Sequence, residues 1–212
     1  SVSGSIPFIL FGFGVVDSFF ESMSGITTTG ATVIAGLDDL PKSLLIYRQL
    51  LQWLGGMGLI VLAIAVMPLL GIGGGQLFKT QTPGPMSEQR LTPRITSTAR
   101  ALWSIYFVLT VLCIFAYRLA GMSYFDAVSH AFSTVSIGGF STHDLSIGFF
   151  DSLSIEIVCI TFMLLSAMSF AVHYSAIYRK QVLKYFYDPE LRFFVSLLIA
   201  VSYTHLTLPT TI

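Results

Sequence analysis

The stretch FFESMSGITTTGAT, residues 19–32, decides the fold, because a short apolar run there meets hydroxyl side chains and a glycine. The apolar run, residues 17–26, is too short to cross a bilayer, which takes about 20 residues of helix. Irregular backbone at membrane depth is tolerated only where protein buries it or where it lines water. We therefore expect a half-helix that enters the membrane and stops at an irregular segment, residues 27–32.

The composition places most of this chain in lipid. Of its 212 residues, 54% are hydrophobic and 10% are charged, whereas a soluble domain carries about 25% charged residues. Membrane lipid is therefore an expected partner. The formal net charge is zero, which gives no reason to expect a nucleic-acid partner. Cys113 and Cys159 lie in apolar runs without a C-x-x-C spacing, and we interpret both as small buried hydrophobic side chains.

Long apolar stretches alternate with shorter ones along the chain. Residues 6–16 are too short to span and have the character of the end of a membrane helix, without features of a signal peptide. Another stretch begins near residue 191 and loses its apolar pattern after residue 201. The stretches that reach spanning length are residues 43–70, 98–119 and 153–178.

A second predicted half-helix, residues 126–135, repeats the first. A shift of 109 residues aligns Gly12 with Gly121, Asp17 with Asp126, Ser24 with Ser133, Gly30 with Gly139 and Thr32 with Ser141. We expect Asp17 and Asp126 to be N-caps, because a carboxylate accepts hydrogen bonds from the free amides of a first helical turn. Parallel repeats of this kind are typical of transport pathways. The predicted fold class is an all-α membrane protein of tandem helix–pore-loop–helix repeats, potassium-channel-like but incomplete.

The charges orient these repeats in the membrane. Eight of the 11 Lys and Arg residues lie in residues 79–100 or 179–192, and the positive-inside rule makes that side cytoplasmic. The loops after the half-helices instead carry acids and are expected to open outward. These acids are Asp38, Asp39, Asp144 and Asp151.

The expected organisation follows from the spans and the charges. Residues 202–212 contain Pro209 and several threonines, and we interpret them as a non-native tail. The glycine-rich run at residues 71–76 follows a membrane helix without a β-α-β unit, so it is not a dinucleotide-binding fingerprint. The other expected parts are a first repeat lacking its start (1–70), a cytoplasmic linker (71–97), a second repeat (98–178), a second cytoplasmic linker (179–190) and the start of a third repeat (191–201).

The irregular segments after the half-helices are candidate ion-binding sites. The C-terminal end of a helix carries partial negative charge, which favours a cation. Successive backbone carbonyls can replace the water around a dehydrated ion, and glycine permits the dihedral angles that align them. An ordinary loop is the alternative reading of either segment alone, and two aligned copies favour a filter. The candidates are Thr27, Thr28, Thr29, Gly30 and Ala31, together with Ser136, Ile137, Gly138, Gly139 and Phe140.

Three charged residues are candidates for the pore mouth or for supporting the filter: Glu21, Arg48 and Asp144. Arg48 lies within an apolar helix, where a charge is usually paired or functional. It either pairs with Glu21 or an outer aspartate, or extends its charged end to the interface. For Glu21 we favour bracing over ion contact, because a carboxylate on the ion would slow its release. Asp144, with His143, either attracts cations at the mouth or belongs to a solvated loop.

The remaining polar residues give no support for enzyme chemistry. His130 aligns with Glu21 in the repeat. A hydrogen bond in the core is its default role, since a metal site needs partner ligands that the sequence does not offer. No Ser-His-Asp set, paired acids or metal-ligand spacing appear in the sequence. We therefore predict that the chain is not an enzyme.

Three quoted stretches together resemble the Trk-type potassium uptake proteins of the Trk, Ktr and HKT superfamily. They are residues 19–32, the run QWLGGMG at residues 52–58 and the run IGGFSTHD at residues 137–144. The resemblance extends in order to about residue 201. It implies uptake of potassium across the bacterial inner membrane by a multi-pass protein whose backbone-carbonyl filter alone holds the potassium ion.

Further expectations come from this resemblance alone. Family members surround one pore with four repeats, and each repeat contributes one filter glycine, here Gly30 and Gly139. A serine at the first position is associated with sodium preference in plant relatives, so Gly30 points to potassium. The resemblance also implies a homodimer and a cytosolic ring of nucleotide-binding regulatory subunits (TrkA-like), which would hold NAD or ATP. This chain contains two repeats and the start of a third, so we expect that it does not conduct alone.

Two rival interpretations remain at this stage. A secondary transporter with broken helices would place an occluded substrate site near the membrane midplane. A membrane scaffold without transport activity would leave the paired glycine segments unexplained.

Overall fold

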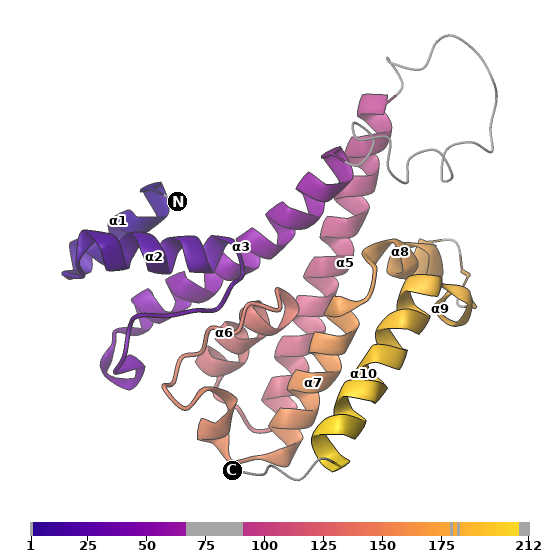
Figure 1. The fold of residues 1–212 in the computed structure, drawn as a ribbon. Helices are drawn as coiled ribbons and strands as arrows, with labels where there is room; N and C mark the ends of the chain where they lie inside the picture. The colour runs from indigo at the N-terminus through magenta and orange to yellow at the C-terminus, as the bar shows by residue number, and fades with distance from the viewer. Residues whose placement is uncertain (1, 67–90, 179, 182, 208–212) are drawn as a thin grey trace. The chain divides into compact units, whose positions relative to one another are not determined.

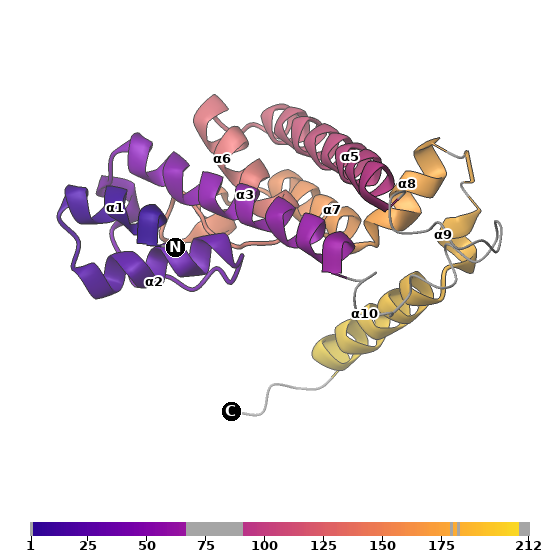
Figure 2. The same ribbon diagram turned by 90° about the horizontal axis from the view of Figure 1, so that it is seen from above.

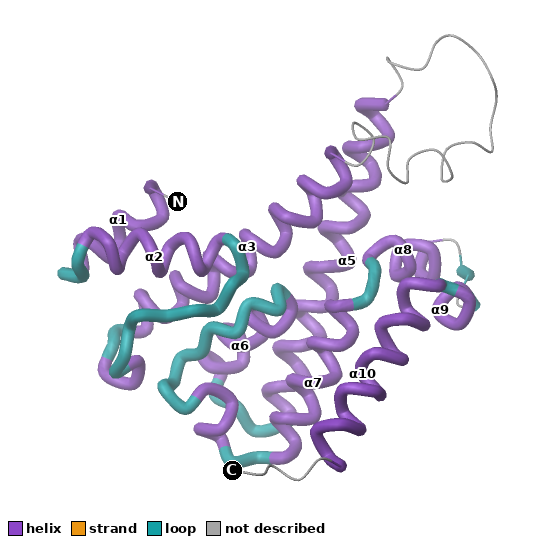
Figure 3. Tube along the Cα trace, in the orientation of Figure 1, coloured by secondary structure: helices purple, strands orange, loops and turns teal. Residues whose placement is uncertain are grey.

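The computed structural model describes residues 2–66, 91–178, 180–181 and 183–207. In these ranges every regular element is a helix and none is a β-strand (Figure 3). The chain forms two compact units, Ser1–Ser166 and Ala167–Ile212. The all-helical architecture predicted from the sequence is confirmed within the described ranges.

The first repeat consists of a helical hairpin packed on a long helix. Its elements are α1 (Val2–Phe11), α2 (Val15–Ile26), the short 3-10 helix η1 (Leu37–Asp39) and α3 (Lys42–Val66). Helix α2 packs against both α1 and α3, and the views in Figures 1 and 2 agree on this arrangement. A small apolar core that includes Phe8, Leu37 and Leu45 joins α1, the loop and α3. The half-helix is thereby fixed at an angle to the long helix.

The second repeat has the same order of elements. It consists of α5 (Leu91–Leu119), α6 (Tyr124–Val135), the 3-10 helix η3 (Ser146–Phe150) and α7 (Leu153–Ala167). Helix α6 packs on α5 and on α3, and α3 also contacts α5. Helix α3 of the first repeat therefore packs against both α5 and α6 of the second repeat.

Close approach along α3 depends on two glycines. A Cβ added to Gly55 would lie 2.1 Å from the carbonyl oxygen of Ile26, the last residue of α2. A Cβ on Gly56 would lie 2.9 Å from Cβ of Ser136, directly after α6. Both half-helices therefore end against the same turn of α3.

The backbone confirms the repeat found in the sequence. The turn glycines Gly12 and Gly121 have φ angles of 109° and 107°. Gly30 and Gly139 have φ angles of 78° and 84°. Because aligned residues adopt the same unusual conformations, the two blocks are copies of one structural unit.

The half-helices end where the sequence predicted but begin earlier. They end at Ile26 and Val135, where the hydroxyl and glycine residues begin. Asp17 and Asp126 are not N-caps, contrary to the prediction. Gly14 precedes α2, and the Ser123 hydroxyl caps α6 by accepting a hydrogen bond from the amide of Asp126. The two acids lie in the first turns, where a negative charge still interacts favourably with the helix dipole.

Two further boundaries differ from those predicted. The expected helix over residues 153–178 is divided, because α7 ends at Ala167 and α8 (Phe170–Tyr178) begins after Ser169. The carbonyl of Ser169 accepts the amide of Val172 and starts the new helix. Helix α5 begins at Leu91, inside the expected linker 71–97. The rest of that linker, including the glycine run 71–76, lies largely or wholly outside the described residues.

The second unit contains α8, the short α9 (Lys184–Tyr187) and α10 (Pro189–Thr207). Helix α9 lies within the expected linker 179–190 and contacts both α8 and α10. Helix α10 continues beyond Ser202, where the sequence predicted that it would end, to Thr207. Residues 208–212 lie outside the described part of the chain. The origin of residues 202–212 stays a prediction.

In the described part of the chain, residues 99–119 of α5 are long and apolar enough by themselves to cross a membrane. Large apolar side chains on this helix are exposed, among them Phe107, Leu112 and Phe115. Helix α3 is less uniformly apolar because it carries Arg48 and nearby glutamines, which it buries inside the protein. Helix α3 also exposes apolar side chains, among them Leu54, Leu59 and Leu62, so it combines a buried polar face with an exposed apolar one.

Candidate ion-binding site

Each half-helix ends in the same tight turn. In the first repeat the amides of Thr27, Thr28 and Thr29 donate to carbonyls in the last turns of α2, at distances of 2.9–3.0 Å. Thr28 and its aligned residue Ile137 have φ angles of 55° and 54°. Such values are uncommon for residues with a Cβ and mark backbone that the surrounding structure holds in place. This turn redirects the chain from the helix into the segment that follows.

The two segments after these turns lie against each other. We call residues 27–32 the first glycine segment and residues 136–141 the second. A Cβ added to Gly30 would lie 2.1 Å from the carbonyl oxygen of Gly138 and 3.5 Å from Cα of Gly139. A Cβ on Gly139 would lie 4.0 Å from Cα of Gly30. The two predicted filter glycines therefore meet, although 109 positions separate them in the sequence.

Protein groups hold only some carbonyls of these segments. The Ser24 hydroxyl donates to the Ala31 carbonyl at 2.5 Å, and the Gln52 amide donates to the Gly138 carbonyl at 2.8 Å. Among the described residues, no hydrogen bond is made to the carbonyls of Thr29, Gly30, Ile137 or Gly139. Those oxygens can coordinate a cation, whereas the Ala31 and Gly138 oxygens already have a protein donor.

A buried ion pair lies behind the first glycine segment. A terminal guanidinium nitrogen of Arg48 lies 2.6 Å from Oε1 of Glu21, and both side chains are 0% exposed. The hydroxyl of Thr32 donates to Oε1 and Oε2 of Glu21 at 2.9 Å and 3.0 Å. In the structure Arg48 therefore pairs with Glu21 inside the protein and does not extend its charged end to the membrane interface. Both carboxylate oxygens of Glu21 are therefore bound by protein groups, and Glu21 anchors the end of the first glycine segment through Thr32.

Arg48 and Gln52 extend from α3 to the second glycine segment. Arg48 donates to the carbonyl of Ser141 at 3.3 Å, and its guanidinium lies 4.4 Å from the ring centre of Phe140. One turn further along α3, Gln52 donates to the Gly138 carbonyl and accepts from the Phe140 amide at 3.1 Å. Both side chains of α3 are 0% exposed. The first repeat therefore supports the filter candidate of the second.

The second repeat replaces the ion pair with neutral groups. His130 Nδ1 donates to the carbonyl of Asp126 at 2.9 Å, so that Nε2 accepts from the hydroxyl of Ser141 at 3.0 Å. His130 and Ser141 align with Glu21 and Thr32 in the repeat. His130 thus makes hydrogen bonds in the core. Within the described ranges, no group of three His, Cys, Asp or Glu side chains is placed to hold a metal ion.

The outer loops of the two repeats are joined by polar contacts. The carboxylate of Asp144 accepts from the amides of Gly36 and Leu37, each at 3.1 Å. His143 contacts Asp38, and this hydrogen bond lowers the pKa of the Asp38 carboxyl below its usual value. The ring of His143 stacks on Phe149 with centroids 3.6 Å apart. Asp144 therefore links the two loops, and its role at the pore mouth stays a prediction.

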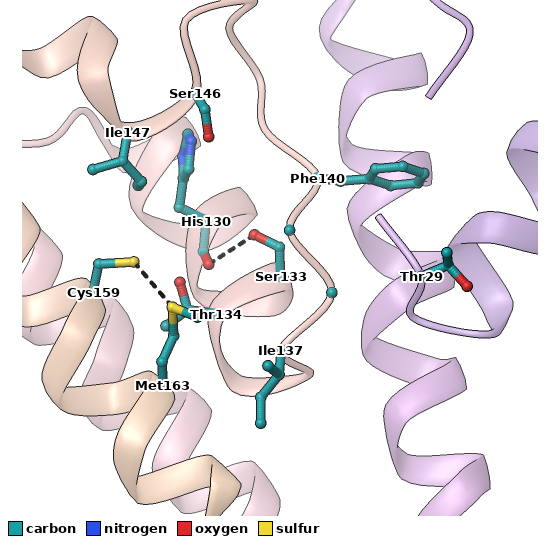
Figure 4. Close-up of a pocket in the computed structure, with 12 residues that line it drawn as sticks. Thr29, His130, Ser133, Thr134, Ile137, Phe140, Ser146, Ile147, Cys159 and Met163 are labelled. Carbon is teal, nitrogen blue, oxygen red and sulfur yellow. Dashed lines mark hydrogen bonds between the residues drawn. The ribbon is translucent and has the colours of Figure 1, made fainter. Parts of the chain in front are cut away.

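A pocket of about 320 Å³ opens beside the second glycine segment. Figure 4 shows Ile137 and Phe140 of that segment, with Thr29 of the first segment on one side and Cys159 and Met163 of α7 on the other. The space beside the segment is large enough for a partly hydrated ion.

Sequence reasoning missed the cross-repeat role of Gln52 and the loop role of Asp38. Arg48, Gln49 and Gln52 stand close together in an otherwise apolar helix, and positions 48 and 52 share one helical face. That pair of polar residues was the available signal. Their partners in the second repeat are more than 80 positions away in the sequence, so no local pattern identifies those partners.

Paired half-helices that end in facing glycine segments, within an all-helical bundle, define a membrane transport protein of the pore-loop class. The family model TrkH, described as a cation transport protein, matches residues 7–212, and the chain belongs to this family. Members of the family are transport proteins and not enzymes, in agreement with the prediction.

Known relatives place this chain within a longer protein. It is 58% identical over 193 residues to the Trk system potassium uptake protein TrkH of Halomonas elongata, covering 90% of this chain and 40% of the relative. It is 50% identical over 195 residues to TrkH of Escherichia coli K12, covering 91% of this chain and 40% of that protein. The crystal structure of the potassium transporter TrkH from Vibrio parahaemolyticus matches with a TM-score of 0.82 and 50% identity, over 94% of this chain and 40% of that one. The chain thus spans about 40% of the length of these relatives.

Proposed function

We propose that this chain forms part of a potassium uptake pathway, in which residues 27–31 and 136–140 supply two sections of a selectivity filter. The observation that carries the proposal is the meeting of Gly30 with Gly138 and Gly139, with aligned left-handed conformations. Relatives that are 58% and 50% identical to this chain over the aligned residues are named potassium uptake proteins. The first filter position holds glycine, Gly30, and not the serine that is associated with sodium preference in plant relatives. Through the family resemblance, this supports a preference for potassium over sodium.

The chemistry of this pathway is dehydration and coordination, without covalent steps. Carbonyl oxygens of Thr29, Gly30, Ile137 and Gly139 replace part of the water around the ion. The C-terminal ends of α2 and α6 add partial negative charge at the same place. Inward movement of one positive charge gains about 2.3 kcal/mol per 100 mV of membrane potential.

The proposal includes the cellular setting of the complete protein. The bacterial inner membrane is its location, with the basic segments around residues 79–100 and 179–192 on the cytoplasmic side. The complete protein has four repeats around one pore and forms a homodimer. A cytosolic nucleotide-binding ring regulates it, and potassium is its cargo. Family resemblance and the charge distribution support these points.

The proposal is tested in a full-length hybrid in which this chain replaces the matching segment of the Halomonas elongata relative. The hybrid is produced in bacterial cells that lack their own potassium uptake systems. We expect growth at limiting potassium and potassium-selective reversal potentials. A correctly inserted hybrid that takes up no potassium, or that admits sodium equally well, would refute the proposed function.

A further inference from the structure

The side chain of Gln52 makes an unusual contact between the two repeats. It projects from α3, which belongs to the first repeat, and it is 0% exposed. Its Nε2 donates to the Gly138 carbonyl at 2.8 Å, and its Oε1 accepts from the Phe140 amide at 3.1 Å. A carboxamide can make both bonds at once because it has a donor and an acceptor on the same planar group.

These two bonds enclose Gly139. Gly139 has a φ of 84° and no side chain of its own to hold that conformation. The peptide groups on either side of it carry the two atoms that Gln52 binds, the Gly138 oxygen and the Phe140 nitrogen. The amide of Gln52 therefore fixes the direction of both peptide planes.

The Gly138 carbonyl is also confined from the opposite direction. A Cβ at Gly30 would lie 2.1 Å from this oxygen, so the two groups are already in close contact. A Cβ at Gly138 would lie 2.4 Å from Cδ of Gln52. The carbonyl is thus held between α3 and the first glycine segment, while the carbonyls of Ile137 and Gly139 have no hydrogen-bond donor among the described residues.

In the described part of the second repeat, the aligned positions of α7 make no equivalent hydrogen bonds to a glycine segment. The positions of α7 that align with Arg48 and Gln52 are Ile157 and Thr161. Ile157 is 54% exposed, and the Thr161 hydroxyl donates to the Ile157 carbonyl of its own helix at 2.7 Å. The contact is therefore a particular property of α3 and not a general consequence of the repeat.

We propose that Gln52 is a positioning residue that sets the ion selectivity of the second glycine segment, by deciding which of its carbonyls face the ion. This inference rests on the proposed function of that segment as a filter. Selectivity depends on the number and arrangement of the carbonyl dipoles around the ion. Without Gln52 the Gly138 carbonyl loses its hydrogen bond to α3 and can turn away from its present direction, so the set of oxygens offered to the ion changes.

The test compares Gln52→Leu and Gln52→Glu with Gln49→Leu in the full-length hybrid. Gln49 is a matched control on the same helix, since it is also 0% exposed and its amide makes no hydrogen bond to the described residues. Gln52→Leu removes both bonds, whereas Gln52→Glu keeps the acceptor for the Phe140 amide and removes the donor to the Gly138 carbonyl.

We expect both Gln52 variants to lower the ratio of potassium to sodium permeability by about tenfold, the effect of leaving one buried polar group without its partner. Gln49→Leu is expected to leave the ratio unchanged. Permeability ratios come from reversal potentials, and size-exclusion profiles confirm folded protein. Unchanged selectivity in the Gln52 variants would overturn the inference, and so would failure of both variants to fold, because Gln52 would then be a general stability residue. If the unsubstituted hybrid itself shows no potassium selectivity, that result refutes the proposed function of the segment, separately from the role of Gln52.

Discussion

At the scale of single residues, the two glycines proposed for the filter, Gly30 and Gly139, are not equivalent. Gly30 and Gly139 have similar positive φ angles, so any side chain strains both positions. Gly30 is in addition closely surrounded, because its Cβ position lies 2.1 Å from a backbone oxygen. The Cβ position of Gly139 has only the Cα of Gly30 nearby, at 4.0 Å.

We therefore expect Gly30→Ser to reduce the selectivity for potassium over sodium more than Gly139→Ser does. Serine at position 139 strains only its own backbone, by about 1–2 kcal/mol. Serine at position 30 also displaces the Gly138 carbonyl. Reversal potentials of the hybrid carrying each substitution measure the difference. Equal effects would contradict the asymmetry, and unchanged selectivity in both variants would argue against a filter.

The buried pair of Arg48 and Glu21 gives a prediction about stability. Removing one partner of a buried ion pair leaves an uncompensated charge and typically costs about 3–5 kcal/mol. Glu21→Gln should therefore lower the thermal midpoint of the purified hybrid strongly. Glu156→Gln on the exposed side of α7 is the control, with an expected change within about 0.5 kcal/mol. Similar midpoints for the two variants would show that the pair contributes little.

At the scale of elements, both half-helices end in close contact with α3. Gly55 faces the Ile26 carbonyl and Gly56 faces Ser136, so the spacing between α3 and each half-helix depends on missing side chains. A change at Gly55 therefore reaches the first glycine segment through α2, whereas a change at Gly56 meets the second glycine segment directly at Ser136.

We expect Gly55→Ala to impair potassium uptake, whereas Gly58→Ala should not. The added methyl at position 55 would meet backbone, which cannot move aside as a side chain can. The methyl at position 58 has no described atom within 4 Å. Initial rates of potassium uptake, corrected for the amount of protein in the membrane, provide the measurement. Full activity of Gly55→Ala would mean that α2 shifts without consequence for the path of the ion.

The elements also show what the sequence could and could not predict. The ends of the half-helices at Ile26 and Val135 were predictable, because hydroxyl residues and glycine replace the apolar run there. Their starts were not, since Ser123 competes with Asp126 for the same cap and the sequence does not decide between them. The division between α7 and α8 was missed because the apolar character continues across it. The partners of Gln52 and Asp144 were hidden by more than 80 intervening positions.

At the scale of the whole molecule, the chain supplies two glycine segments, and it spans about 40% of the length of its relatives. Ion coordination by backbone carbonyls requires oxygens on all sides of the ion. Two segments that contact each other surround only part of such a path. In the proposed filter, the remaining side is supplied by segments of the complete protein outside residues 27–31 and 136–140.

We therefore expect that the 212-residue chain alone, reconstituted in lipid bilayers, gives no potassium-selective current. The full-length hybrid under the same conditions is the positive control. Current recordings across a potassium gradient make the comparison. A selective current from the short chain would mean that copies of it assemble a complete path, and it would refute this expectation.

The contact of α3 with the second glycine segment has a consequence for biogenesis. The ribosome completes α3 before it makes residues 136–140, and membrane segments that emerge first are available first as folding partners. The supports of the first glycine segment, Glu21 and Arg48, are likewise in place by then. We therefore expect the second glycine segment to fold against side chains of α3 that the ribosome has already synthesised.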